Sequence, residues 1–311
     1  MILYVKHNEI DKERWDTSVT RALNTRIYAY SWYLDIISPG WDALVEGDYK
    51  SIFPLTHHQK GGVPYLFQPF FAQQLGLFSD TIITHEKMEE FIHAIPPTFR
   101  FVEIQLNSMN IVTGEEGKIP SRINHELDLG SSYSELISKY AQNTRRNLKK
   151  AQNAGLEVRQ TVTSNELVSL FRENFGKQEG KLKDCHYSMM QQVIEEGMKQ
   201  GKGVLCGSFT STGELDAAAF FILDQARAYY LFAASSSGAR ENGAMFLLID
   251  NFVKNHANKS LILDFEGGND PNLGRFYKSF GAKEVYYPRL IINRLPGIIQ
   301  PLQRLWREIR R

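Results

Sequence analysis

Apolar residues recur along the first half of the chain with two periods, every second position in some stretches and every third or fourth in others. The first period is typical of β-strands and the second of amphipathic helices. In chain order, the pattern predicts a strand at 2–6, a helix at 11–21, a hairpin at 41–55, a strand at 63–71, a helix at 85–95, and strands at 101–106 and 119–129. We therefore expect a mixed α/β domain.

The second half repeats this order of elements without repeating the sequence. The pattern predicts a strand at 156–162, helices from 163 and at about 187–200, a hairpin at 204–223, a strand at 228–234, a helix at about 242–256 and a strand at 261–265. Thr163 and Glu166 form a capping box, which marks the start of the first of these helices. We therefore expect two similar domains in tandem, each with a mixed central sheet flanked by helices.

A helical connector is predicted between the two halves. Ser132 and Glu135 form a capping box at its start, and Gly155 suits the left-handed position that ends a helix. The predicted organisation is an N-terminal domain at 1–130, the connector at 131–155, a C-terminal domain at 156–295, and a basic amphipathic tail at 296–311.

Composition and charge are those of an ordinary globular protein. Of 311 residues, 42% are hydrophobic and 23% charged, and the net charge is +1. This balance argues against sequence-specific nucleic-acid binding and restricts any polyanion site to a local patch. Cys185 and Cys206 lack metal-site spacing, and no run has the length of a leader or a membrane span. We therefore expect reduced thiols and a cytoplasmic location.

The most distinctive stretch is 261–282, an apolar strand followed by an acidic turn and a short helix. Asp270 and Pro271 suit the N-cap and first position of that helix, and Gly281 suits its end. The segment NLGRFYKSFGA at 272–282 resembles the last conserved segment of the GNAT superfamily of N-acyltransferases. With LDFEGG before it and TRRNLKKAQNAG at 144–155, the chain is more narrowly similar to the two-domain, Fem-related (FemAB-like) branch.

The resemblance implies roles for three residues of this stretch. Tyr277 resembles the GNAT tyrosine that protonates the leaving group, and a phenol with a pKa near 10 suits a thiolate. Asp264 and Glu266 alternate along the strand, so they are expected to share a face, where one of them takes the proton of the amine. The alternatives are a core tyrosine and a carboxylate that bridges neighbouring backbone groups.

A donor site is predicted in the small, glycine-containing segment SSSGARENGA at 235–244. Backbone N–H groups at the start of the following helix can face an anion there. The segment resembles a partly lost GNAT pyrophosphate signature, in which Met245 replaces the last small residue. The predicted donor-binding residues are Ser235, Ser236, Gly238, Arg240, Asn242, Gly243, Ala244 and Asn272. The resemblance implies acyl-CoA, such as acetyl-CoA, as cosubstrate, and the alternative is an ordinary glycine turn.

The corresponding segment of the first half, 72–80, has one glycine and no basic residue. We therefore expect the first domain to have lost its carrier site and to shape the acceptor site instead. No set of His, Asp and Glu has the spacing of metal ligands, so we expect no metal.

Two basic segments are candidates for contact with anionic partners. Arg145, Arg146, Lys149 and Lys150 lie one helical turn apart in pairs. They form either a solvated helix face or a docking site for the phosphates of coenzyme A, acyl carrier protein or transfer RNA. The tail at 296–311 either contacts an anionic membrane surface or packs on the protein.

These features predict a GNAT-type N-acyltransferase that moves an acyl group from an acyl-CoA donor to an amine, either a small molecule or a component of the cell envelope. One alternative is an aminoacyl-tRNA-dependent peptidyltransferase of peptidoglycan cross-bridge synthesis. The other is a non-catalytic GNAT-like binding module. The sequence does not specify the acceptor, because fold analogy does not select a substrate.

Overall fold

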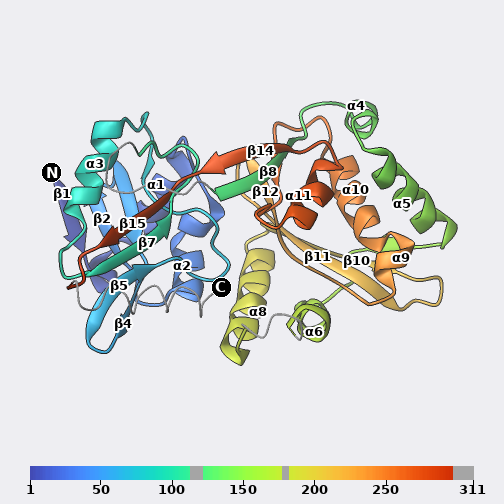
Figure 1. Cartoon of the computed structure of the whole chain (residues 1–311), viewed down its shortest axis with the longest axis horizontal. Coiled ribbons are helices and arrows are strands. Elements are labelled where there is room, and N and C mark those ends of the chain that lie inside the picture. The colour runs from blue at the N-terminus through green and yellow to red at the C-terminus, as the bar shows by residue number, and fades with distance from the viewer. Residues whose placement is uncertain (113–121, 177–181, 297–311) are drawn as a thin grey trace. The chain divides into compact units, whose positions relative to one another are not determined.

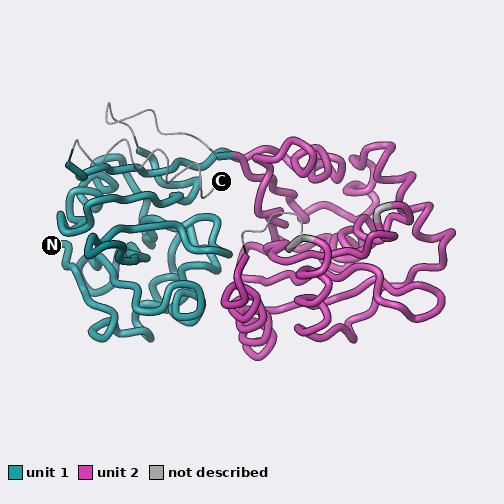
Figure 2. Tube along the Cα trace, turned by 60° about the horizontal axis from the view of Figure 1, so that its bottom comes forward, with its two compact units in different colours: residues 1–122, 286–311 teal, residues 123–285 magenta. Residues whose placement is uncertain are grey.

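The computed structural model describes residues 1–112, 122–176 and 182–296, and only the backbone of Phe175, Gly176 and Arg240. The chain divides into two compact units (Figure 2). Unit 1 comprises Met1–Arg122 and Tyr286–Arg311, and unit 2 comprises Ile123–Val285.

Unit 1 contains two four-stranded sheets (Figure 1). The first has the order β1-β2-β3-β6 and is formed by β1 (Ile2–Val5), β2 (Asp42–Glu46), β3 (Ser51–Leu55) and β6 (Phe78–Ser79). The second has the order β15-β7-β5-β4 and is formed by β15 (Arg289–Asn293), β7 (Phe101–Gln105), β5 (Val63–Phe67) and β4 (His57–Lys60). The helical elements of the unit are η1 (His7–Glu9), α1 (Lys12–Arg21), η2 (Ile27–Ala29), α2 (Ser31–Ile37) and α3 (His85–Ala94).

Unit 2 is built on a seven-stranded sheet of order β14-β8-β13-β12-β11-β10-β9. In that order the strands are β14 (Lys283–Tyr287), β8 (Arg122–Asp128), β13 (Ile262–Asp264), β12 (Arg227–Ser235), β11 (Leu215–Leu223), β10 (Gly203–Phe209) and β9 (Glu157–Arg159). β12 and β13 are parallel, whereas β8 pairs with β13, and β10 with β9 and β11, in antiparallel fashion. The sheet is therefore mixed.

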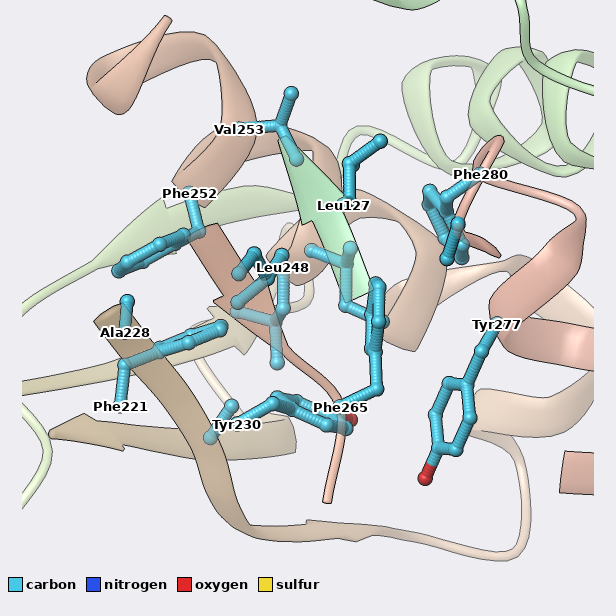
Figure 3. Close-up of a cluster of buried hydrophobic side chains, with 14 of the residues drawn as sticks. Leu127, Phe221, Ala228, Tyr230, Leu248, Phe252, Val253, Phe265, Tyr277 and Phe280 are labelled. Atoms are coloured by element: carbon cyan, nitrogen blue, oxygen red, sulfur yellow. The ribbon is translucent and has the colours of Figure 1, made fainter. Parts of the chain in front are cut away.

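Helices cover both faces of this sheet. They are α4 (Tyr133–Ser138), α5 (Gln142–Asn153), α6 (Ser164–Phe171), η3 (Arg172–Gly176), α8 (Asp184–Lys199), α9 (Ala239–Asn242), α10 (Ala244–His256) and α11 (Pro271–Lys278). On one face, Phe221 of β11 stacks on Phe252 of α10 with ring centroids 3.9 Å apart, inside the core shown in Figure 3. On the other face, Gly197 of α8 lies against Phe220 and Ile222. Consecutive residues of β11 thus point to opposite layers.

The helix boundaries follow the local signals in the sequence. The capping boxes of Ser132 and Thr163 are both formed, at the starts of α4 and α6. Asp270 accepts hydrogen bonds from the backbone N–H groups of Asn272 and Leu273 at the start of α11. Gly155 and Gly281 have φ values of +66° and +85°, a conformation that an L-residue with a Cβ adopts only with strain.

The compact units differ from the predicted domain boundaries at three places. β8, which overlaps the predicted strand at 119–129, pairs with β13, so unit 2 begins at Ile123. The predicted connector at 131–155 contains α4 and α5, which are helices of unit 2, and α5 packs on α10. Sequence patterning also missed α2, β14 and β15, and β15 pairs with β7 of unit 1. The spacing of apolar residues can identify a strand, but it does not show which distant strand pairs with it. This explains the differences.

The tail prediction falls almost wholly outside the described residues, since only Pro296 of 296–311 is among them. None of the helices in the described ranges is both long enough and apolar enough to span a membrane.

Candidate functional site

Strands β12 and β13 of unit 2 pair over three residues and then separate. Residues 227–229 pair with 262–264, after which β13 ends while β12 continues to Ser235. In the described part of the chain, no strand pairs with the rest of β12 on that side. The chain leaves β13 through the turn before α11, and it leaves β12 through the loop before α10. The two segments singled out by sequence therefore start from the carboxyl ends of neighbouring parallel strands, a common location for ligand sites.

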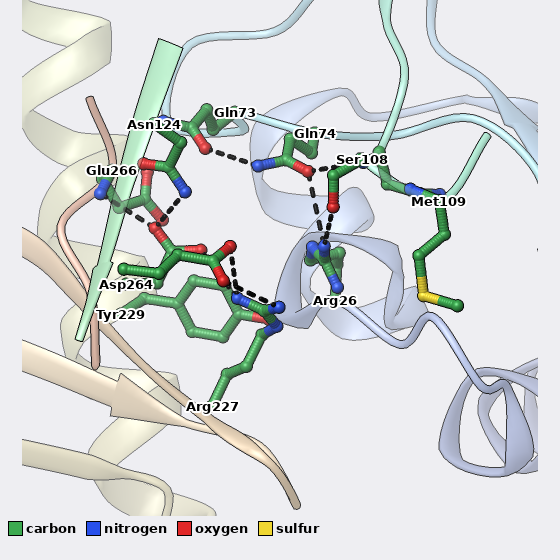
Figure 4. A network of polar contacts seen from close by, with 12 residues as sticks. Arg26, Gln73, Gln74, Ser108, Met109, Asn124, Arg227, Tyr229, Asp264 and Glu266 are labelled. Carbon is green, nitrogen blue, oxygen red and sulfur yellow. Dashed lines mark hydrogen bonds and ion pairs between the residues drawn. The ribbon is translucent and has the colours of Figure 1, made fainter. Parts of the chain in front are cut away.

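Asp264 is a fully buried carboxylate whose contacts hold this region together (Figure 4). Its Oδ1 accepts hydrogen bonds from Asn124 Nδ2 at 2.8 Å and from the backbone N–H of Glu266 at 2.9 Å. Its Oδ2 lies 3.4 Å from Arg227 Nη1, which also pairs with Glu126 at 2.8 Å. Burial raises the pKa of Asp264, and the Arg227 charge opposes that rise. These contacts match the bridging role that was the alternative to catalysis.

Glu266 does not share a strand face with Asp264, so that prediction is wrong. β13 ends at Asp264, and Glu266 has a φ of +60°, which places it in the left-handed region. The physical reason is the hydrogen bond from the Glu266 N–H to the Asp264 carboxylate, which turns the chain out of the strand. Left-handed backbone at a residue other than glycine costs about 1–3 kcal/mol and is found disproportionately at functional sites. A catalytic role for Glu266 stays a prediction.

Tyr277 lies at the edge of the aromatic core, beside Phe265 (Figure 3). Its ring stacks on that of Phe265, with centroids 4.7 Å apart, and lies 5.9 Å from the ring of His125. Burial raises the pKa of Tyr277, and the negative charges of Glu266 and Asp270 contribute further. The phenol therefore keeps its proton at neutral pH and is suited to donate it to a strong base.

The loop predicted to bind pyrophosphate already contains a carboxylate. Asp216, at the start of β11 and 6% exposed, accepts hydrogen bonds from Ser236 Oγ and from Asn242 Nδ2. Its backbone carbonyl accepts the Ser236 N–H at 2.8 Å. The Ala244 N–H donates to Asn242 Oδ1 at 3.0 Å, so one of the first N–H groups of α10 is also occupied. The described residues of this loop therefore do not fit a pyrophosphate, because a buried carboxylate would repel it.

The same loop touches α5, which carries the basic face. A Cβ on Gly243, whose φ is +85°, would lie 2.3 Å from the carbonyl oxygen of Asn147. The two backbone segments are therefore so close that only glycine fits at position 243. On the exposed face of α5, its first two turns line a concavity of about 540 Å³. Its lining residues are Gln142, Asn143, Arg145, Arg146 and Lys149. The structure thus brings together two predicted segments that are far apart in sequence.

The cationic groups of α5 are available for an anion. Arg145 donates to the Ser138 carbonyl at 2.6 Å, and Arg146 donates to Asn143 Oδ1 at 2.9 Å, so both bind neutral acceptors. Within the described ranges, neither they nor Lys149 and Lys150 form an ion pair.

The remaining predicted donor residues are dispersed. Ser235 is the last residue of β12 and Gly238 precedes α9, whereas exposed Asn272 accepts a hydrogen bond from Arg275 in the first turn of α11. The side chain of Arg240 lies outside the described residues. No group of three or more His, Cys, Asp or Glu among the described residues is arranged to hold a metal ion.

Sequence reasoning missed two buried groups that the structure makes prominent. In unit 1, Arg26 donates to the Thr25 carbonyl at 2.8 Å and to Ser108 Oγ at 3.1 Å (Figure 4). In unit 2, His125 of β8 lies against the turn before α11, with Nδ1 2.9 Å from the Gly267 carbonyl oxygen. The second glycine of LDFEGG, Gly268, was the available signal for His125, since a glycine leaves room for a neighbouring side chain.

Unit 2 has a mixed sheet flanked by helices, and a solved tandem GNAT structure is similar over nearly the whole chain, which confirms the predicted fold class. The solved structure of FemX is similar over 98% of this chain and 99% of its own, with a TM-score of 0.66 and 14% identity. The Fem-like resemblance of the fold is thereby confirmed as well.

Two further solved structures share this fold. A tandem GNAT protein from the clavulanic acid biosynthesis pathway matches 96% of this chain and 100% of its own, with a TM-score of 0.52 and 11% identity. The C-terminal domain of a lysylphosphatidylglycerol synthetase from Agrobacterium fabrum matches 92% of each chain, with a TM-score of 0.54 and 9% identity. No family model and no curated protein matches the sequence. At these identities the likeness concerns the fold alone.

Proposed function

We propose that this chain is an N-acyltransferase that moves an acyl group from a phosphate-bearing carrier to an amine. The observation that carries the proposal is the contact between Gly243 and Asn147, which joins the loop that follows β12 to α5, the helix whose exposed face carries the cationic concavity. The acyltransferase-like fold supports the reaction class. Phosphates of the carrier bind Arg145, Arg146 and Lys149 in this proposal.

The transfer itself depends mainly on positioning of the amine against the acyl carbonyl. The amine nitrogen forms a bond to the carbonyl carbon, and the bond between that carbon and the carrier breaks. Tyr277 donates its proton to the departing atom of the carrier. Asp264 is committed to Asn124, Glu266 and Arg227, so it holds the turn rather than accepting the proton of the amine.

Two observations favour an oxygen ester, as in aminoacyl-tRNA, over the thioester of acyl-CoA. Asp216 occupies the loop in which a coenzyme A pyrophosphate was expected. Burial raises the pKa of Tyr277 above the ordinary value of a phenol. An acid of that strength is better matched to an alkoxide, which needs protonation, than to a thiolate, which leaves readily without it. We therefore propose an aminoacyl ester of transfer RNA as donor and an amine of the cell envelope or a small molecule as acceptor.

The experiment that tests this proposal offers both donors to the full chain. Binding of acetyl-CoA is measured by isothermal titration, and binding of a radiolabelled aminoacyl-tRNA mixture by filter retention at fixed salt. We expect retention of aminoacyl-tRNA and no heat from acetyl-CoA. Sub-millimolar binding of acetyl-CoA alone would instead support an enzyme that uses acyl-CoA as donor. If neither donor binds, the hypothesis of a non-catalytic binding module is favoured.

A further inference from the structure

His125 has one bonded and one bare ring nitrogen inside unit 2. Its side chain is 1% exposed, and its Nδ1 lies 2.9 Å from the carbonyl oxygen of Gly267. Because a carbonyl oxygen only accepts, Nδ1 carries the hydrogen, and the neutral ring presents a lone pair at Nε2. Among the described residues, Nε2 is buried without a hydrogen-bond partner. An unbonded polar atom in this position is uncommon and calls for a functional explanation.

The turn before α11 is shaped around this imidazole. A Cβ on Gly268, whose φ is +142°, would lie 2.2 Å from His125 Nδ1, and a Cβ on Gly274 would lie 3.3 Å from Cε1. In contrast, a Cβ on Gly267 would meet no atom within 4 Å. Glycine is therefore required where the chain passes the ring, and one hydrogen bond fixes the tautomer of that ring.

Titratable groups surround the bare nitrogen. Glu284 of β14 places its Oε1 4.0 Å from Nε2, and the same oxygen lies 2.5 Å from Lys278 Nζ. The ring of Tyr277 of α11 is also close, with ring centroids 5.9 Å apart. Gly274 and Tyr277 are three residues apart on α11, so they share the helix face that packs on His125. The imidazole thus has both a carboxylate and the proposed acid as neighbours.

We propose that His125 is the residue that returns a proton to Tyr277 after each transfer, with Glu284 as the partner of its imidazolium form. This inference rests on the proposed function. Tyr277 is 7% exposed, so water has little access for reprotonating it, whereas His125 is its immediate neighbour. The pairing of an imidazole with a fixed tautomer and a carboxylate is a common arrangement for moving protons.

The protons balance over one transfer. The amine nitrogen bonds to the ester carbonyl carbon, the carbon–oxygen bond to the carrier breaks, and the departing oxygen takes the proton of Tyr277. The neutral Nε2 of His125 accepts the proton that the amine nitrogen loses on forming the amide. The imidazolium formed in this way then returns that proton to the tyrosinate. No oxidant or reductant is involved.

The variant that isolates this role is His125→Asn. The asparagine Nδ2–H replaces the Nδ1–H and can still donate to the Gly267 carbonyl, whereas nothing replaces Nε2. We expect an unchanged melting temperature, an unchanged KM, and a kcat lowered about 100-fold or more, with loss of the acidic limb of the pH–rate profile. Retention of the wild-type kcat and pH profile would show that His125 only supports the turn.

A second measurement is independent of activity and of how the variant folds. Nitrogen NMR of the wild-type protein labelled at histidine reports which ring nitrogen carries hydrogen across the pH range. We expect hydrogen on Nδ1 and a lone pair on Nε2, and we expect Glu284→Gln to change the Nε2 resonance because the carboxylate 4.0 Å from that nitrogen is removed. Lys278, Glu266 and Asp270 stay unchanged in both proteins, so they do not account for the difference.

The two measurements separate the two proposals. An imidazole with hydrogen on Nε2 and none on Nδ1 overturns the role of His125 whatever the donor. If neither donor is used while Nε2 keeps its lone pair near Glu284, the proposed function fails and the proton-accepting site stands without it.

Discussion

Asp264 and His125 are buried titratable side chains on neighbouring strands of the same sheet, and they differ in how fully they are bonded. Asp264 receives hydrogen bonds from Asn124 and Glu266 and pairs with Arg227. His125 has one hydrogen bond, to Gly267, and a bare Nε2. A carboxylate held by three donors stabilises one protonation state and one chain path. The imidazole has a nitrogen that no hydrogen bond among the described residues uses.

The largest effect is expected from removing the fully bonded group. Asp264→Ala leaves Asn124 and the Glu266 N–H without their acceptor and Arg227 with Glu126 alone, so we expect a loss of about 2–4 kcal/mol in the free energy of unfolding. Urea denaturation of the full chain measures it. Asp48→Ala is the control, since Asp48 forms an exposed pair with Arg14 and should change stability by less than about 1 kcal/mol. Equal effects for the two variants would show that the Asp264 contacts do not hold the turn.

Removal of the Tyr277 hydroxyl should act on turnover rather than on folding. We expect Tyr277→Phe to lower kcat about 100-fold while leaving donor affinity unchanged, because the proton for the departing atom is lost. Since burial raises the pKa of Tyr277, the wild-type rate should show no alkaline decline from this group below about pH 10.

The matched variant for Tyr277 is Tyr133→Phe, which removes the hydroxyl that donates to Asp250 at the junction of α4 and α10. Steady-state kinetics on both proteins, with the donor identified by the binding experiment, should separate them. A Tyr277→Phe protein as active as Tyr133→Phe would remove Tyr277 from the mechanism.

Two adjacent glycines test whether the turn is fitted to His125. Gly268→Ala forces a Cβ to within 2.2 Å of the imidazole at a φ of +142°, so we expect a loss of about 1–3 kcal/mol. Gly267→Ala places its Cβ in open space and should change stability little. Thermal unfolding compares the two. If both alanines cost the same, the close approach to His125 is not what requires glycine.

The smallest effect concerns the carrier site. Arg146→Ala combined with Lys149→Ala should weaken binding of aminoacyl-tRNA about tenfold. The slope of log affinity against log salt concentration should fall by an amount that corresponds to roughly one to two phosphate contacts. Lys199→Ala combined with Lys254→Ala removes the same charge from other exposed helix positions of unit 2. A similar loss in both double variants would indicate attraction by net charge rather than a site on α5.

Local sequence signals were enough to predict where helices begin and which glycines adopt left-handed backbone. Ser132, Thr163 and Asp270 cap helices with their own side chains, and Gly155 and Gly281 adopt left-handed backbone, because these choices depend on a few consecutive residues. The alternation of apolar residues likewise placed most strands. The segment at 272–282 and the order of elements were enough to predict the fold class.

Only the tertiary structure decided which distant groups meet. It assigned β8 to the seven-stranded sheet of unit 2, joined the Gly243 loop to α5, brought Asp216 against that loop, and placed His125 next to Glu284 and Tyr277. Strand partners, hydrogen-bond partners and burial are set by contacts between residues far apart in sequence, as His125 and Gly267 illustrate with a separation of 142. Side-chain chemistry can be read from the sequence, but whether a group is fully bonded or has an unused nitrogen depends on what folding brings beside it.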